Sequence, residues 1–61
     1  MKYTVVVYFK DPAKSDQTFN VDWYTHTNGI LEMFTYSGKN TQIKIIALPD
    51  VTSIDITQIG D

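Results

Sequence analysis

The sequence predicts an all-β fold, a single antiparallel meander of about five strands in a strongly twisted sheet or a small, partly closed barrel. Short runs rich in β-branched and aromatic residues fill almost the whole 61-residue chain. Segments with glycine, proline or asparagine separate these runs, and no stretch shows the 3.6-residue periodicity of a helix. We therefore expect residues 1–61 to form a single small β domain.

The first two predicted strands lie on either side of a polar loop. Residues 1–10 contain three adjacent valines and several aromatic residues, which fit a pleated strand better than a helix. Pro12 lies in the loop that follows, because proline cannot donate a hydrogen bond to a ladder. Residues 17–25 form the second predicted strand. One face of it carries Phe19, Val21 and Trp23.

Three further strands are predicted at residues 29–36, 41–48 and 54–59. Residues 37–40 contain a glycine and favour a hairpin turn between the first two of these strands. Pro49 ends the next strand, and residues 51–53 supply a turn before the last one. The chain is thus read as consecutive antiparallel strands joined by short connections.

The hairpin turn at Asn28-Gly29 determines which face of the sheet forms the core, because a register shift of one residue exchanges the two faces. A two-residue loop would place Glu32 on the core face together with Trp23. A three-residue loop with a bulge at the glycine would place Trp23 opposite Met33 and turn Glu32 outward. Burying an unpaired carboxylate costs several kcal/mol, whereas exchanging the apolar side chains costs only about 1 kcal/mol. The bulged register is therefore favoured over the two-residue loop.

The bulged register leaves apolar residues on both faces of the sheet. The expected core comprises Tyr3, Val5, Val7, Phe9, Phe19, Val21, Trp23, Leu31, Met33, Ile43, Ile45, Ile54 and Ile56. The opposite face carries Val6, Tyr8, Tyr24, His26, Ile30, Phe34, Tyr36, Ile46 and Leu48. Large apolar patches are rare on soluble monomers, so this second face is covered either by barrel closure or by another protein chain. The candidate interaction face comprises Tyr8, Tyr24, His26, Ile30, Phe34, Tyr36 and Ile46.

Composition narrows the possible functions. The chain has no cysteine and one histidine, so disulfides and thiolate metal sites are excluded and neither a metal nor a cofactor is expected. A domain this small usually gains stability from a disulfide, a metal or oligomerisation, which leaves a homo-oligomer. No run is long enough to span a membrane, and no signal peptide pattern follows Met1. We expect a soluble, complete, cytoplasmic protein.

Two sets of residues have the composition of a chemical site. Asp22, Tyr24 and His26 alternate along one predicted strand and share a face, but no cleft or nucleophile accompanies them. No catalytic residues are therefore assigned, and the protein is not expected to be an enzyme. The aromatic residues of the sheet could stack single-stranded bases. However, the net charge is −2 and arginine is absent, so binding of nucleic acid is only the alternative function.

The hydrophobic pattern as a whole resembles that of a group of phage proteins. The pattern runs from the strand at residues 3–9 through Phe19-x-Val21-x-Trp23 to the segment 48–56, in which Pro-x-Val-x-x-Ile-x-Ile closes the chain. It is similar to small uncharacterised β-meander proteins of phages and prophages of low-GC Gram-positive bacteria. This resemblance implies an accessory protein in the host cytoplasm that binds or inhibits a host protein. A non-catalytic protein-binding module is therefore the expected function.

Overall fold

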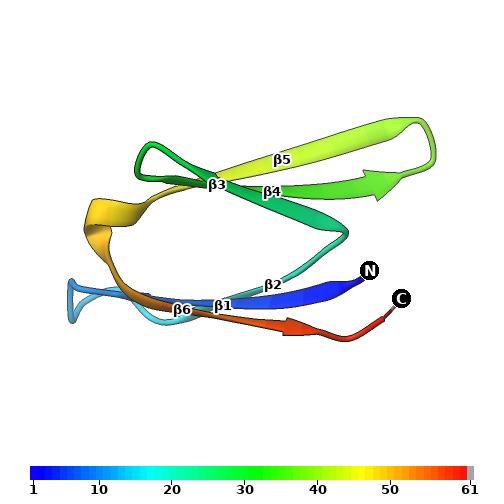
Figure 1. Cartoon of the computed structure of the whole chain (residues 1–61). Coiled ribbons are helices and arrows are strands. Elements are labelled where there is room, and N and C mark those ends of the chain that lie inside the picture. Colours follow the sequence, from blue (N-terminus) through cyan, green and yellow to red (C-terminus); the bar gives the residue numbers. More distant parts are fainter. Residues whose placement is uncertain (61) are drawn as a thin grey trace.

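The computed structural model, which describes residues 1–60, contains six β-strands and one 3₁₀ helix in two three-stranded antiparallel sheets (Figure 1). The elements are β1 (Tyr3–Phe9), β2 (Gln17–Val21), β3 (Trp23–Thr27), β4 (Ile30–Ser37), β5 (Asn40–Ala47), η1 (Leu48–Asp50) and β6 (Val51–Gln58). The all-β class and the antiparallel pairing are confirmed. The predicted single meander is not, because the strand orders are β2-β1-β6 and β3-β4-β5 and neither sheet closes on itself.

The two sheets lie one above the other and are connected at opposite ends (Figure 1). At one end β2 passes into β3 through the single residue Asp22. At the other end η1 carries the chain from β5 to β6, which pairs with β1. The proline-containing segment before β6 therefore forms a 3₁₀ turn at Leu48–Asp50, and the turn predicted at 51–53 is instead the beginning of β6.

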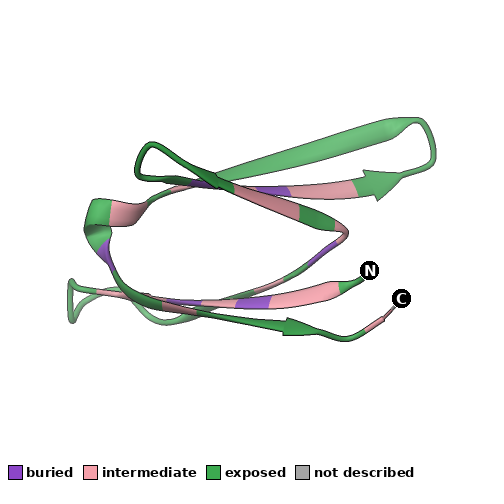
Figure 2. Cartoon of the chain, viewed as in Figure 1, coloured by how far each residue is buried: buried purple, intermediate pink, exposed green. Residues whose placement is uncertain are grey.

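The core lies between the facing sides of the two sheets (Figure 2). The buried apolar side chains are Val5, Val7, Val21, Leu31, Met33 and Val51. Partly buried residues packed against them are Tyr3, Phe9, Phe19, Tyr24, Ile46, Leu48 and Ile54. Most of the predicted core is thus confirmed, but Trp23, Ile43, Ile45 and Ile56 are exposed.

The corner at Asp22 explains why Trp23 lies outside the core. In an uninterrupted strand Val21 and Trp23 would share a face, because side chains alternate. The inward-facing side chain after Val21 is instead Tyr24, since Asp22 interrupts the alternation at the passage from one sheet to the other. The predicted faces of residues 17–21 are therefore correct, and those of residues 23–27 are reversed.

The hairpin between β3 and β4 has the two-residue loop, so the favoured bulged register was wrong. Thr27 pairs with Ile30, and both Asn28 (φ 53°) and Gly29 (φ 74°) have the positive φ that such tight turns require. The objection to this register was the burial of Glu32. It does not apply, because the reversal of β3 allows Met33 to point inward while Glu32 points outward with Trp23.

β5, which corresponds to the strand predicted at residues 41–48, also presents the opposite face from the one predicted. Ser37 pairs with Asn40 across another two-residue turn, so Ile46 packs on the core while Ile43 and Ile45 point to solvent. Because Ile43, Ile45 and Ile46 place apolar side chains on both faces of the strand, alternation alone does not show which face is inward. The length of the turn fixes the register and therefore the inward face. In β6, by contrast, a register shift opposite Tyr8 allows both Val51 and Ile54 to face inward.

Candidate functional site

The outward side of the β3-β4-β5 sheet is an apolar surface, here called the outer apolar face. Its members alternate with the buried residues of β4 and with the inward side chains of β5. The face comprises Ile30, Phe34, Tyr36, Ile43 and Ile45, with Trp23 at its margin. Phe34 is half-buried, whereas Tyr36, Ile43 and Ile45 are 55%, 53% and 62% exposed. Large side chains of this kind normally lie inside a protein, so the face is a candidate binding surface.

A continuous apolar row crosses this face. Phe34 in the middle strand pairs with Trp23 on one side and with Ile43 on the other. Beside this row Glu32 is the one formally charged side chain among the strand positions of the face, and it accepts a hydrogen bond from the hydroxyl of Thr25 at 3.4 Å. Interfaces between proteins are depleted in charge at their centres and enriched in aromatic residues. The row consists of two aromatic residues and one isoleucine and carries no charge, as the centre of such an interface does.

The Trp23 ring leans over the edge of β3 into a cluster with two tyrosines. It stacks beside Tyr24 with ring centroids 6.1 Å apart and meets Tyr3 edge-on at the same distance. Tyr3 and Tyr24 in turn pack perpendicular to each other at 5.1 Å. This cluster joins the two sheets beside the corner and leaves Trp23 49% exposed, so Trp23 can contribute both to stability and to binding.

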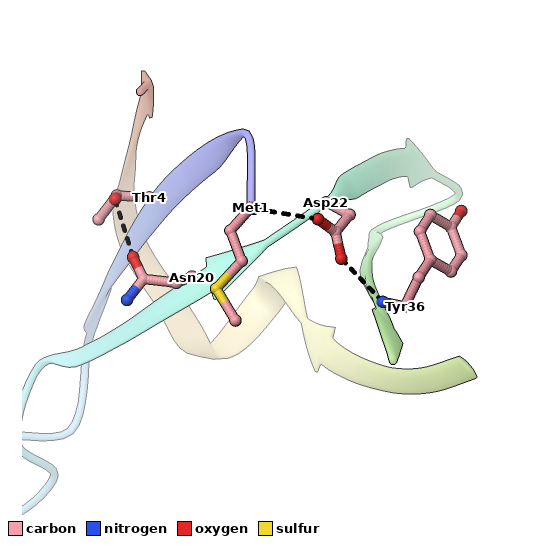
Figure 3. Close-up of polar contacts among 5 residues, drawn as sticks. All are labelled: Met1, Thr4, Asn20, Asp22 and Tyr36. Atoms are coloured by element: carbon pink, nitrogen blue, oxygen red, sulfur yellow. Dashed lines mark hydrogen bonds and ion pairs between the residues drawn. The ribbon is translucent and has the colours of Figure 1, made fainter. Parts of the chain in front are cut away.

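Asp22 fixes the corner with three hydrogen-bonding groups (Figure 3). Its backbone N–H donates to the carbonyl of Phe34 at 2.9 Å, and one carboxylate oxygen accepts from the backbone N–H of Tyr36 at 2.8 Å. The other oxygen lies 3.4 Å from the amino group of Met1. The hydrogen bond from Tyr36, followed by the nearby amino group, holds the pKa of Asp22 below its usual value. The corner therefore sets the position of β4, where the outer apolar face has its centre.

The outward side of the β2-β1-β6 sheet is polar. The Thr4 hydroxyl donates to the side-chain oxygen of Asn20 at 2.9 Å, and the Tyr8 hydroxyl donates to Asp55 at 3.1 Å. This hydrogen bond, and then the negative charge of Asp55, raise the pKa of Tyr8 above its usual value of 10.0. Val6 lies between Thr18 and Asp55 on this side. Its surroundings are those of an ordinary solvated sheet face.

A cleft of about 360 Å³ opens between the sheets, next to β2. It is lined by Met1, Thr18, Phe19, Asn20, Val21, Met33, Thr35, Gln42 and Lys44. The ammonium of Lys44 lies 5.6 Å from the centroid of the Phe19 ring, a cation–π contact between two residues of the lining. Among residues 1–60 no buried side-chain nitrogen or oxygen lacks a hydrogen-bond partner. Its described lining therefore contains no buried polar side-chain atom that is left without a partner.

The structure does not bring the seven predicted face residues together. Ile30, Phe34 and Tyr36 lie on the outer apolar face, and Tyr8 lies on the outward side of the other sheet. Tyr24 and Ile46 pack against the core, as does Leu48 from the larger predicted set. His26 is exposed near the end of β3. Sequence reasoning missed Ile43 and Ile45 as face residues, because it assigned them to the core.

Across residues 1–60 no three histidine or acidic side chains come close enough to hold a metal ion. Asp22 and Tyr24, predicted to share a face with His26, diverge at the corner: Asp22 contacts the backbone of Tyr36, while Tyr24 packs on Tyr3. No helix in the described chain is both long and apolar enough to cross a membrane.

Comparisons with known proteins add no relative. No protein-family model, no curated protein and no solved structure matches the chain.

Proposed function

We propose that the protein is a non-catalytic binding module that docks onto a protein partner through the outer apolar face. One observation carries the proposal: three side chains of this face, Tyr36, Ile43 and Ile45, are each more than half exposed in a chain whose other outward sheet face is polar. Exposing such side chains to water is unfavourable by roughly 25 cal/mol per Å² of apolar surface. A partner that covers them recovers this free energy.

A protein partner fits this surface better than a nucleic acid does. Protein interfaces gain most of their affinity from a few aromatic and apolar side chains surrounded by a polar rim, and Phe34, Tyr36 and Trp23 are such residues. Nucleic acid binding requires lysines or arginines to neutralise phosphates. The charged group on this face is instead the carboxylate of Glu32, and the whole chain carries a net charge of −2.

The source of the partner follows from the sequence resemblance. Small phage and prophage accessory proteins act by contact with a protein of their bacterial host, so a host protein in the cytoplasm is the proposed target. Binding would block or redirect that protein without any chemical step. This part of the proposal depends on the resemblance, whereas the docking surface depends on the exposure of its residues.

A matched pair of tyrosine variants tests the docking surface. Tyr36→Ser removes a ring from the outer apolar face, and Tyr8→Ser removes a ring from the outward side of the other sheet. The immobilised wild-type chain is used to capture a partner from a host lysate, and the captured protein is then purified and titrated by calorimetry. We expect Tyr36→Ser to weaken the measured affinity at least tenfold and Tyr8→Ser to change it less than twofold. Equal effects of the two variants would overturn the proposal.

The nucleic-acid alternative has its own measurement. Trp23 is the only tryptophan of the chain and is half exposed, so its fluorescence reports a base stacked on it. Titration with single-stranded oligonucleotides at low salt is expected to leave the emission unchanged. Saturable quenching that weakens as salt is added would favour nucleic acid over a protein partner.

A further inference from the structure

The outermost strands of the two sheets differ in how well they are protected against pairing with another chain. Natural sheets protect such strands with charges, bulges, proline or shortness. β2 and β3 have five residues each and meet at the corner. β6 has eight residues but contains the register shift and carries Asp55. β5 also has eight residues, yet it pairs with β4 in unbroken register and carries one charge, Lys44.

The backbone of β5 offers a regular row of free hydrogen-bonding groups. Ser37 and Asn40 close a two-residue turn, so alternate residues of β5 starting at Asn40 bond to β4. The bond from the N–H of Leu48 to the carbonyl of Gly29 at 2.8 Å continues this alternation. The intervening residues direct their N–H and C=O groups away from β4 at the outer edge of the sheet. They are Thr41, Ile43, Ile45 and Ala47.

The described chain also leaves more surface exposed than a compact monomer does. Its accessible surface is 4390 Å², whereas a 7.0 kDa monomer typically exposes about 4,000 Å². Its radius of gyration is 11.8 Å, against about 10.5 Å for a compact chain of this length. The five most exposed side chains of the outer apolar face and its margin present roughly 500 Å² in total. Pairing along the edge of the sheet leaves this area exposed, so it remains available to the protein partner of the proposed function.

We propose that β5 pairs in antiparallel orientation with β5 of a second copy of this chain, about a twofold axis at Ile43. The two three-stranded sheets then form one six-stranded sheet. The row Trp23–Phe34–Ile43 continues into Ile43, Phe34 and Trp23 of the second copy. This inference deepens the proposed function, because the dimer joins two outer apolar faces into one surface, but it can be tested without any other partner.

The register follows from the alternation of free groups and from Lys44. Only registers that place free backbone groups opposite each other can form the ladder, and twofold symmetry then puts the axis on a residue of β5, with the longest overlaps for axes at residues 43 and 44. An axis at Lys44 would place two ammonium groups directly opposite each other, which is destabilising. An axis at Ile45 leaves a shorter overlap. The axis at Ile43 places Lys44 opposite Gln42 of the second copy and pairs residues 40–46.

Single cysteine variants test this register, because the native chain has no cysteine. At the axis, the two copies of residue 43 form a hydrogen-bonded pair with Cα atoms about 5.5 Å apart, within the range for a disulfide. Residue 45 lies opposite Thr41, so its two copies are about 13 Å or more apart. After mild oxidation we expect Ile43→Cys to form a covalent dimer on a non-reducing gel and Ile45→Cys to remain mostly monomeric.

The outcomes of the crosslinking experiment are distinct. Ile59→Cys serves as the control for random collision, because Ile59 is exposed to a similar degree, 55%, but lies beyond β6. Preferential crosslinking of Ile45→Cys would overturn the proposed axis. Crosslinking of Ile43→Cys no faster than that of Ile59→Cys would overturn the pairing of β5 altogether.

Sedimentation equilibrium of the unoxidised protein gives an independent measurement. Ile43→Lys places two ammonium groups across the axis and is expected to raise the dimer dissociation constant at least tenfold. Ile59→Lys, the same substitution at a similarly exposed isoleucine, is expected to leave it within twofold. Circular dichroism confirms that both variants fold. A wild-type chain that is monomeric at millimolar concentration would overturn the dimer, whereas the capture experiment with Tyr36→Ser would still test the protein partner separately.

Discussion

The two sheets of this protein have three strands each and both direct apolar side chains into the core, yet their outward sides differ in chemistry. One side has hydroxyl, amide and carboxylate groups that bond to one another, such as Thr4 with Asn20 and Tyr8 with Asp55. The other side exposes Tyr36, Ile43 and Ile45. The core requires apolar residues only on the inward sides. The difference between the outward sides therefore marks the surface where contact with another protein is expected.

The largest expected effect comes from comparing the inward and outward sides of one sheet. Leu31 is 2% exposed, whereas Ile45 in the neighbouring strand is 62% exposed. Leu31→Ala is expected to cost about 2–5 kcal/mol of unfolding free energy, comparable with the total stability of about 3–5 kcal/mol for such a domain. Ile45→Ala should change it by less than about 0.5 kcal/mol. Urea denaturation measures both values, and a similar loss in the two variants would place Ile45 in the core.

Trp23→Ala is expected to have an intermediate effect. The ring is half exposed but contacts Tyr3 and Tyr24, and each such aromatic pair contributes about 0.5–1.5 kcal/mol. The variant should remain folded, with unfolding free energy lowered by roughly 1–2 kcal/mol, because the core does not depend on this ring. Thermal denaturation followed by circular dichroism checks this. Complete unfolding would show that Trp23 is a core residue, as the continuous-strand interpretation predicted.

Asp22 links the two sheets, so its titration is expected to appear in the stability of the whole chain. Because folding lowers the pKa of this carboxyl, its contribution is present above the pKa of the unfolded chain and is lost as pH falls through the lower folded value. Asp22→Asn should reduce stability at pH 7 and flatten the decrease that the wild type shows below about pH 4. Urea denaturation midpoints of variant and wild type, measured at pH 7 and below about pH 4, test this. Parallel curves for variant and wild type would show that the carboxylate does not stabilise the corner.

The smallest expected effect concerns the polar outward side. The pKa of Tyr8 is raised most by its hydrogen bond to Asp55 and least by the charge of Asp16. Asp55→Asn should lower it toward the usual tyrosine value, while Asp16→Asn should hardly change it. Ultraviolet titration of each variant, with Tyr8→Phe subtracted, isolates this phenol. The same shift in both variants would argue against the hydrogen bond.

Local patterns were enough to predict the all-β class and most of the core, but residues 17–25, expected as one strand, form two. Alternation in residues 3–9 correctly placed Val5 and Val7 inside, and the turn residues marked both tight hairpins. The corner at Asp22 could not be predicted in the same way, because it contains neither glycine nor proline. Its carboxylate is satisfied by the backbone of Tyr36, fourteen positions further along the chain. That contact exists only after folding, and it reverses the faces of β3.

The candidate surface was predicted in part for a related reason. Phe34 and Tyr36 were assigned to the correct side of β4, but Tyr24 was added because residues 17–25 were interpreted as one continuous strand. In β5 the run Ile43-Lys44-Ile45-Ile46 has apolar residues on both sides, so alternation could not distinguish them. The register of pairing with β4 determines which of these residues face the core, and a short stretch of sequence contains no information about that register.

The single-residue corner has a consequence for how the chain tolerates changes in length. Deleting Asp22 would restore strict alternation from Val21 through Trp23 to Tyr24, so every side chain could keep its side while β2 and β3 joined into one straight strand. A straight strand carries β3 away from the β2-β1-β6 sheet of its own chain, so the two sheets of one molecule can no longer pack on each other. We expect such a deletion to drive two molecules to exchange the segment from β3 to β6, since shortened hinges favour domain swapping. Chain length at this one position would then control which molecule completes the fold.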